Sequence, residues 1–152
     1  MKNGPPDSPA PTAANPGTPH SGVEVAAGLI FRNGVLLITQ RRADGHLGGL
    51  WEFPGGKREP SETFEECLRR ELREELGIDV IVAELLETIT HTYLGQSVHL
   101  KFYRCTLRCG EPKAIGCDAL AWIQADDLGA YSFPPADERL LERLRQTPEL
   151  WR

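Results

Sequence analysis

The residues of this chain best suited to chemistry are three glutamates, Glu71, Glu74 and Glu75. Their spacing of i, i+3 and i+4 places all three carboxylates on one face of an α-helix. Like charges at this spacing repel each other, and a cation held among them would offset that repulsion. Mg²⁺ and Mn²⁺ prefer hard oxygen ligands of this kind, so the cluster predicts a divalent metal site. The alternative is a solvated acidic face whose charge is offset by the neighbouring arginines Arg69, Arg70 and Arg73.

The sequence around these glutamates predicts one helix with defined ends. Thr63, followed three residues later by Glu66, forms a capping-box pattern at the N-terminus. Apolar residues then recur every four positions and predict a buried stripe, formed by Phe64, Leu68, Leu72 and Leu76. Gly77 ends the helix, because glycine adopts the left-handed C-cap conformation without strain. The glutamates therefore lie beside the core stripe, where the helix meets the Gly-rich segment before it.

The composition is that of a soluble globular domain. The chain has 152 residues, of which 40% are hydrophobic and 26% charged, and a net charge of -5. This charge argues against a nucleic-acid polymer as partner, because sequence-independent binding needs a basic surface. No apolar run approaches the ~20 residues of a membrane span, and the N-terminus lacks the apolar segment of a secretory signal. The four cysteines lack metal-binding spacing and fit free thiols in a reducing compartment, so we expect a cytoplasmic protein without a membrane partner.

Two regions of the chain differ in composition. Residues 1–21 contain six of the 12 prolines, and the rest is mostly small and polar, which is typical of a disordered tail. Residues 22–152 are predicted to form one domain. Its expected strands are 23–31, 35–39, 80–90, 98–107 and 119–123, with a short extended piece at 50–53, and its last helix is 136–144. This order predicts an α/β (α+β) sandwich, with a mixed, mainly antiparallel sheet and two main helices.

Residues 56–78 resemble the Nudix box. The resemblance rests on nine defined positions across 23 residues, namely Gly56, Glu62, Arg70, Glu71, Leu72, Glu74, Glu75, Gly77 and Ile78. The strand order around the motif also fits the Nudix fold, so the resemblance covers about residues 22–145. It implies a Nudix-type α/β/α sandwich for the domain.

The resemblance also implies an enzyme, a Nudix hydrolase that cleaves a nucleoside diphosphate linked to another group with the help of Mg²⁺ or Mn²⁺. The catalytic residues that it implies are Glu71, Glu74, Glu75 and Arg70. The implied metal ligands are the backbone carbonyl of Gly55 and the carboxylates of Glu71, Glu74 and Glu75. Among them Glu71 is the implied general base, while Arg70 and Glu62 are expected to hold the loop against the helix.

Within the family the chain looks most similar to the MutT branch, which removes oxidised nucleotides. Residues 39–46, 50–57 and 133–137 carry this closer resemblance. The substrate-binding residues that it implies are Arg41, His46, Glu52, Phe53, Pro54, Gly55 and Asp137. Three of them have a simpler alternative: Arg41 as a surface arginine, His46 as a loop histidine, and Asp137 as an acidic residue at a helix N-terminus.

The resemblance implies a small-molecule nucleotide as partner. The expected reaction cleaves a nucleoside triphosphate between its α and β phosphates and releases a monophosphate and diphosphate. The substrate most favoured is 8-oxo-dGTP, and CTP or a modified pyrimidine nucleotide is the alternative. A non-catalytic module that reads oxidised guanine is the alternative of another class. We expect a monomer, with a dimer left open.

Two positions depart from the pattern of the MutT branch. Asp137 stands where bacterial MutT proteins have asparagine, and an ionised aspartate accepts hydrogen bonds but cannot donate them. Gly116 stands where the family often supplies one more glutamate to the metal. Asp118 is close in sequence but has the wrong strand parity to replace that glutamate directly. We therefore expect either one ligand fewer or a substitute from Asp118.

Overall fold

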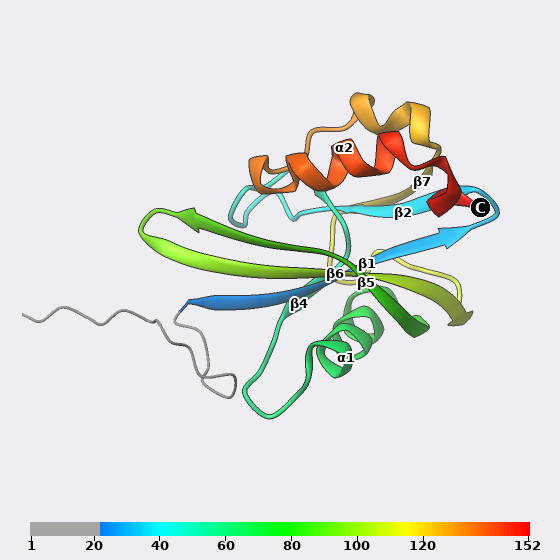
Figure 1. Ribbon diagram of the computed structural model, residues 1–152. Helices are drawn as coiled ribbons and strands as arrows, with labels where there is room; N and C mark the ends of the chain where they lie inside the picture. Colours follow the sequence, from blue (N-terminus) through cyan, green and yellow to red (C-terminus); the bar gives the residue numbers. More distant parts are fainter. Residues whose placement is uncertain (1–21) are drawn as a thin grey trace, which may run out of the picture.

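The computed structural model describes residues 22–152. The predicted tail, residues 1–21, lies outside the described residues. Figure 1 shows a central sheet with helix α1 (Phe64–Leu76) on one side and helix α2 (Glu138–Gln146) on the other. This layering confirms the predicted α/β/α sandwich with two main helices.

Seven strands form the sheet, in the order β3-β2-β1-β6-β5, with β4 paired to β1 and β7 paired to β2. Their bounds are β1 Val23–Arg32, β2 Val35–Gln40, β3 Trp51–Glu52, β4 Gly55–Lys57, β5 Asp79–Tyr93, β6 Gln96–Cys109 and β7 Ala119–Ile123. β1 and β6 run parallel, whereas β5 and β6 form a long antiparallel hairpin. The sheet is therefore mixed and mainly antiparallel, as predicted. No helix of the described residues is long and apolar enough to cross a membrane.

Strand β1 is buried on both of its faces. Residues 26–30 are buried without a break, and successive side chains of a strand point to opposite faces of the sheet. Ala27 and Leu29 belong to the apolar cluster under α2, while Ala26 and Ile30 belong to the cluster under α1. One strand thus joins the two halves of the core.

Helix α1 has the ends that its sequence predicts. The Thr63 Oγ1 accepts a hydrogen bond from the Glu66 N–H at 3.0 Å, and the Thr63 N–H donates to the Glu66 carboxylate at 2.9 Å. Gly77 follows the helix in the left-handed conformation, with φ of 70°. Leu68, Leu72 and Leu76 are fully buried along the face that meets the sheet. These contacts fix the helix, and with it the direction of its glutamates.

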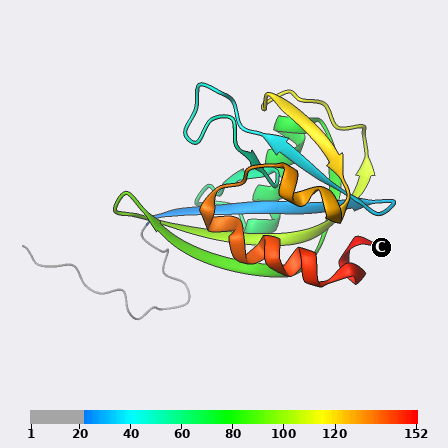
Figure 2. The ribbon, with the colours of Figure 1, turned by 90° about the horizontal axis from the view of Figure 1, so that it is seen from above.

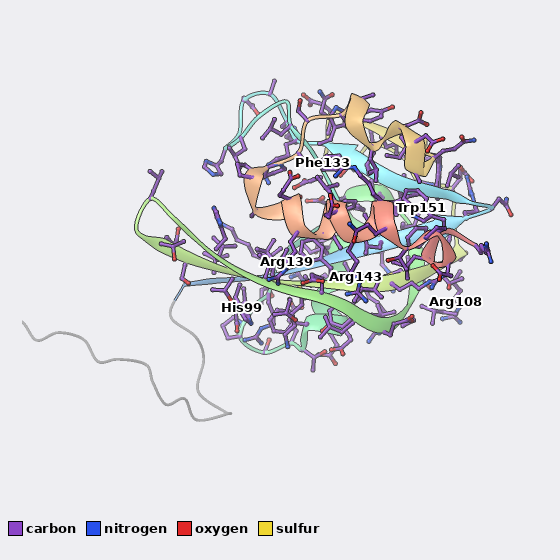
Figure 3. The ribbon with its side chains drawn as sticks, turned by 45° about the horizontal axis from the view of Figure 1, so that its top comes forward. His99, Arg108, Phe133, Arg139, Arg143 and Trp151 are labelled. Carbon is purple, nitrogen blue, oxygen red and sulfur yellow. The ribbon has the colours of Figure 1, made fainter. Side chains whose placement is uncertain are left out.

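Helix α2 is fixed above β5 and β6, as the view from above shows (Figure 2). Its arginines Arg139 and Arg143 extend towards β5 (Figure 3), where both bind the Glu87 carboxylate, at 2.9 and 3.1 Å. Leu140, Leu141 and Leu144 are buried on the same side. The segment that enters α2 is thereby held over one face of the sheet.

Strand β4 is the element that the sequence does not predict. Pro54, Gly55 and Gly56 indicate the end of an extended piece, but Gly55–Lys57 pairs with residues 25–27 of β1. Glycine has low intrinsic strand propensity, so this pairing comes from tertiary contacts rather than from local preference. Residues 125–130 and 148–151 form short 3₁₀ turns that were not predicted either.

The capping box gives the first testable prediction. Thr63→Ala removes the side-chain acceptor for the Glu66 N–H and is expected to lower the free energy of unfolding by about 1 kcal/mol. Thr63→Ser keeps the acceptor and should stay close to the wild type. Urea denaturation followed by circular dichroism measures both variants, and equal stability of the alanine and serine variants would contradict the role of the cap.

Candidate active site

A pocket of about 760 Å³ lies where the sheet, the end of β4 and the start of α2 meet. It brings together most of the predicted site residues: Arg41, His46, Glu52, Phe53, Gly55, Glu71, Glu75 and Asp137. Three predicted residues, Pro54, Arg70 and Glu74, do not line it. Pro54 is buried, and its carbonyl accepts a hydrogen bond from the Gly28 N–H at 2.8 Å, so its main-chain contact is with β1.

The two glycines of β4 allow a close approach that no other residue permits. A Cβ at Gly55 would lie 1.9 Å from the Ala26 carbonyl oxygen, inside the pairing with β1. A Cβ at Gly56 would lie 2.1 Å from the Glu71 carboxyl carbon. The Glu71 carboxylate therefore rests directly on the backbone of β4. The Gly55-Gly56 pair is needed for β4 to pack against β1 and α1, and it allows the Glu71 side chain of α1 to line the pocket.

Arg70 holds the loop before α1 against the helix. Its guanidinium donates to the Glu62 carboxylate at 3.0 and 2.6 Å and to the Lys57 carbonyl at 3.1 Å. It also donates to Glu71 at 3.1 Å and to Glu74 at 3.3 Å. Arg70 thus contacts two of the predicted metal ligands from outside the pocket. This geometry agrees with the structural role that the sequence predicts for Arg70 and Glu62.

The carboxylates that face the pocket are costly to keep charged. Burial raises the pKa of Glu75 to about 7, and repulsion by Glu71, Glu52 and Glu74 adds to this effect. Burial also raises the pKa of Glu71, while the Arg70 charge opposes the increase. A divalent cation beside these groups would favour their ionised forms and offset their repulsion.

The donor set suits a hard cation, although the three glutamates do not converge. Within residues 22–152, no three histidine, cysteine or acidic side chains form a group that could hold a metal ion. Glu74 is 59% exposed and bound to Arg70, whereas Glu71 and Glu75 line the pocket. A ligand set of all three glutamates needs the Glu74 side chain to turn away from Arg70.

Other residues of the pocket belong to aromatic contacts and to a charged network. The Phe53 ring stacks on Phe133 at 5.2 Å between centroids. The Arg41 guanidinium binds the Glu52 carboxylate at 2.9 Å, and burial raises the pKa of Glu52. Asp137 is only 5% exposed, so it is not a solvated residue at a helix N-terminus. His46 is exposed in the loop after β2 and lines the mouth of the same pocket.

Sequence reasoning missed several apolar residues of the pocket, among them Ala27, Leu100 and Phe102. The alternation of Val98, Leu100 and Phe102 predicts that they share one face of a strand, and all three line the pocket. The signal for a common face was therefore in the sequence. The use of that face for a pocket follows from the sheet pairing and from α2.

The loop between β6 and β7 packs against the end of α1. The N–H groups of Ile115 and Gly116 both donate to the Glu75 carbonyl, at 3.1 and 3.0 Å, and a Cβ at Gly116 would lie 3.1 Å from the Glu75 Cγ. Asp118 does not approach the glutamates in this way, because its carboxylate accepts from the Ala43 N–H at 2.9 Å. In this arrangement the Asp118 carboxylate is bound to the loop after β2.

Comparison with known proteins agrees with this geometry. The NUDIX domain family matches residues 26–143. The chain belongs to the Nudix family. It is 40% identical over 120 residues to the CTP pyrophosphohydrolase of Escherichia coli, which covers 79% of this chain and 89% of that protein. It is 39% identical over 123 residues to the 8-oxo-dGTP diphosphatase of Haemophilus influenzae, which covers 80% of this chain and 90% of that protein.

A solved relative shares both sequence and fold with this Nudix hydrolase. The crystal structure of a MutT NUDIX hydrolase from Burkholderia pseudomallei superimposes with a TM-score of 0.72 at 30% identity, covering 79% of this chain and 95% of that one. The predictions of a Nudix fold and a Nudix hydrolase are confirmed. Nudix hydrolases generally use divalent metal ions and act on small nucleotides.

The bond between Arg70 and Glu62 predicts a defined pH dependence of stability. Hydrogen bonds from Arg70 lower the pKa of Glu62 to about 2. Because the unfolded value is higher, at about 4.3, the stabilisation is present above that pH and is lost as pH falls towards 2. Glu62→Gln is expected to cost about 1 kcal/mol at neutral pH and to flatten the fall in stability below about pH 5.

Urea denaturation at several pH values measures this effect. Glu59→Gln is the matched control, because the Glu59 side chain is 65% exposed and lies 4.0 Å from Arg70. It should follow the wild-type pH dependence. If the Glu62→Gln variant showed the wild-type pH dependence as well, the bond between Arg70 and Glu62 would not stabilise the fold as described.

The contact between Gly56 and Glu71 predicts a loss of turnover. Gly56→Ala forces the Glu71 carboxylate away from β4, and a displacement of about 1 Å in such a site is expected to lower kcat about 100-fold. Gly129→Ala is the control, because a Cβ there meets nothing within 4 Å. Nucleotide hydrolysis is measured for both variants after their folding has been verified by circular dichroism. Full turnover by the Gly56→Ala variant would exclude an essential position for Glu71.

Proposed function

We propose that this Nudix hydrolase cleaves nucleoside triphosphates to a monophosphate and diphosphate, with 8-oxo-dGTP as its main substrate. The observation that carries the proposal is one pocket that contains two kinds of groups. Glu71 and Glu75 are acidic groups suited to a metal-bound phosphate chain, and Phe53, Phe102 and Asp137 are groups suited to a base. Relatives named 8-oxo-dGTP diphosphatase, 34–45% identical over 55–82% of this chain, support this choice.

CTP is the second candidate. The E. coli relative named CTP pyrophosphohydrolase is 40% identical across 89% of its own length, which is as close as the relatives named for the oxidised nucleotide. Asp137 is compatible with either base, because a carboxyl oxygen accepts a hydrogen bond from the N7–H of 8-oxoguanine or from the amino group of cytosine.

In the proposed mechanism the carboxylates of Glu71, Glu74 and Glu75 and the Gly55 carbonyl would hold Mg²⁺ or Mn²⁺. The bound metal would neutralise phosphate charge and lower the pKa of the attacking water. Glu71 would take the water proton, and this choice is supported by its carboxylate, which lies against the β4 backbone and accepts from Arg70 at 3.1 Å. Arg70, which does not line the pocket, would support Glu71 through its hydrogen bond.

The protein's other contribution is to position the nucleotide. The Phe53 and Phe102 rings would pack against the base, and Arg41, which is bound to Glu52, and His46 would contact the sugar and phosphates. Water oxygen would attack one of the two phosphorus atoms of the α–β linkage, and the bridging oxygen would leave with the other fragment, so that a monophosphate and diphosphate are released. The water proton would pass to Glu71 and then to solvent.

A nucleotide panel tests this proposal. With Mg²⁺ present, kcat/KM is measured for 8-oxo-dGTP, dGTP, CTP and 5-methyl-dCTP, and the released diphosphate is identified. We expect kcat/KM for 8-oxo-dGTP to exceed that for dGTP at least about tenfold, which corresponds to about 1.4 kcal/mol. EDTA should abolish turnover, and added Mg²⁺ or Mn²⁺ should restore it.

The contrary outcomes are distinct. A higher kcat/KM for CTP than for 8-oxo-dGTP would replace the main substrate with the second candidate. Stable binding of oxidised guanine nucleotides without release of diphosphate would identify the chain as a non-catalytic binding module. Turnover that survives EDTA treatment would contradict the metal-dependent mechanism.

A further inference from the structure

Asp137 is a buried acid whose side chain is not used by the fold. It is 5% exposed and lines the pocket at the start of α2. It occupies the N-cap position of that helix, yet its carboxyl makes no capping hydrogen bond. In the part of the chain that the structure describes, no donor binds this carboxyl. An acid buried in this way is available to a ligand.

The surroundings of Asp137 favour its protonated form. Burial raises the pKa of Asp137 to about 7, and the Glu52 charge adds to the increase while the Arg41 charge opposes it. Arg41 is itself bound to Glu52 at 2.9 Å, which limits its effect on Asp137. The walls that β1 and β6 contribute nearby are apolar, at Ala27, Leu100 and Phe102. The other titratable side chains of the pocket are His46, Lys57, Glu71, Glu75 and His91.

We propose that Asp137 binds the nucleobase as a neutral carboxylic acid, donating one hydrogen bond and accepting another. This inference rests on the proposed function and specifies how the base is selected. An ionised carboxylate can only accept, whereas a neutral carboxyl offers an O–H donor beside a carbonyl acceptor. It thereby presents the same pair of groups as the amide of asparagine.

A donor beside an acceptor matches the bases of both candidate substrates. In 8-oxoguanine the N7–H donor lies next to the O6 acceptor, and in cytosine the amino donor lies next to the N3 acceptor. Unoxidised guanine presents two acceptors, N7 and O6, on the corresponding edge. A neutral Asp137 can satisfy only one of these and leaves the other facing a carbonyl oxygen, which costs free energy in a buried site. The same residue thus favours 8-oxoguanine or cytosine over guanine.

The inference predicts that binding takes up a proton. Above about pH 7 the free Asp137 is ionised and must gain a proton to bind the base, so affinity falls as pH rises, by up to about tenfold per pH unit. Calorimetric titration of 8-oxo-dGMP and CMP in the presence of Mg²⁺, in buffers of different ionisation enthalpy, measures this uptake directly. Near pH 8 we expect the wild type to gain close to one proton per bound nucleotide.

Asp137→Asn is the matched variant, because the amide keeps both hydrogen bonds but cannot titrate. It should bind 8-oxo-dGMP within about tenfold of the wild type near pH 6 and take up about one proton fewer near pH 8. Glu52→Gln leaves Asp137 in place, removes the repulsion and frees Arg41, so it should shift the fall in affinity to lower pH.

The results separate this inference from the proposed function. Equal proton uptake by the wild type and the Asp137→Asn variant, or loss of binding by that variant near pH 6, would overturn the role of a neutral Asp137. An unchanged pH dependence in the Glu52→Gln variant would overturn it as well. Normal hydrolysis of 8-oxo-dGTP alongside any of these results would leave the proposed function intact. Absence of hydrolysis for every nucleotide would remove the proposed function itself.

Discussion

The site depends on the interaction of one guanidinium with several oxygens. Arg70 binds Glu62 on the loop before α1, the Lys57 carbonyl at the end of β4, and Glu71 and Glu74 on the helix. Without this charge, three acidic side chains would repel each other at the point where loop, strand and helix meet. Arg70 thus allows negative charge to be concentrated beside the pocket before any cation binds, and it does so without occupying the pocket.

The sandwich explains how residues from opposite layers reach one pocket. α1 and α2 cover different faces of the sheet, and β1 contributes to the apolar cluster under each of them. Glu71 and Glu75 nevertheless line the same pocket as Asp137, because β4 contains glycine where the helix approaches. In the proposed function, phosphate chemistry and base recognition come from helices on separate layers, so a change near Asp137 would not need to disturb Glu71 and Glu75.

The structural features that can be predicted from the sequence are those that short-range interactions determine. The limits of α1, the capping box at Thr63 and the C-cap at Gly77 follow from short-range patterns, and the sequence predicts them well. β4 exists only because β1 pairs with it, and glycines give no local sign of a strand. The burial of Asp137 was equally hidden, since its position resembles the start of an ordinary helix. In the β6–β7 loop the Asp118 carboxylate accepts a hydrogen bond from the Ala43 N–H, a contact that sequence spacing cannot indicate.

The same β6–β7 loop sets a limit on how the chain can be altered. Its backbone completes the C-terminal end of α1 by bonding the carbonyls of Glu75 and Leu76, and Arg42 reaches back to the Gly116 carbonyl at 3.3 Å. The connection is exposed and without regular structure over much of its length, so it resembles a convenient site for a fused domain or an affinity tag. An insertion there would disrupt the hydrogen bonds that complete the last turn of α1.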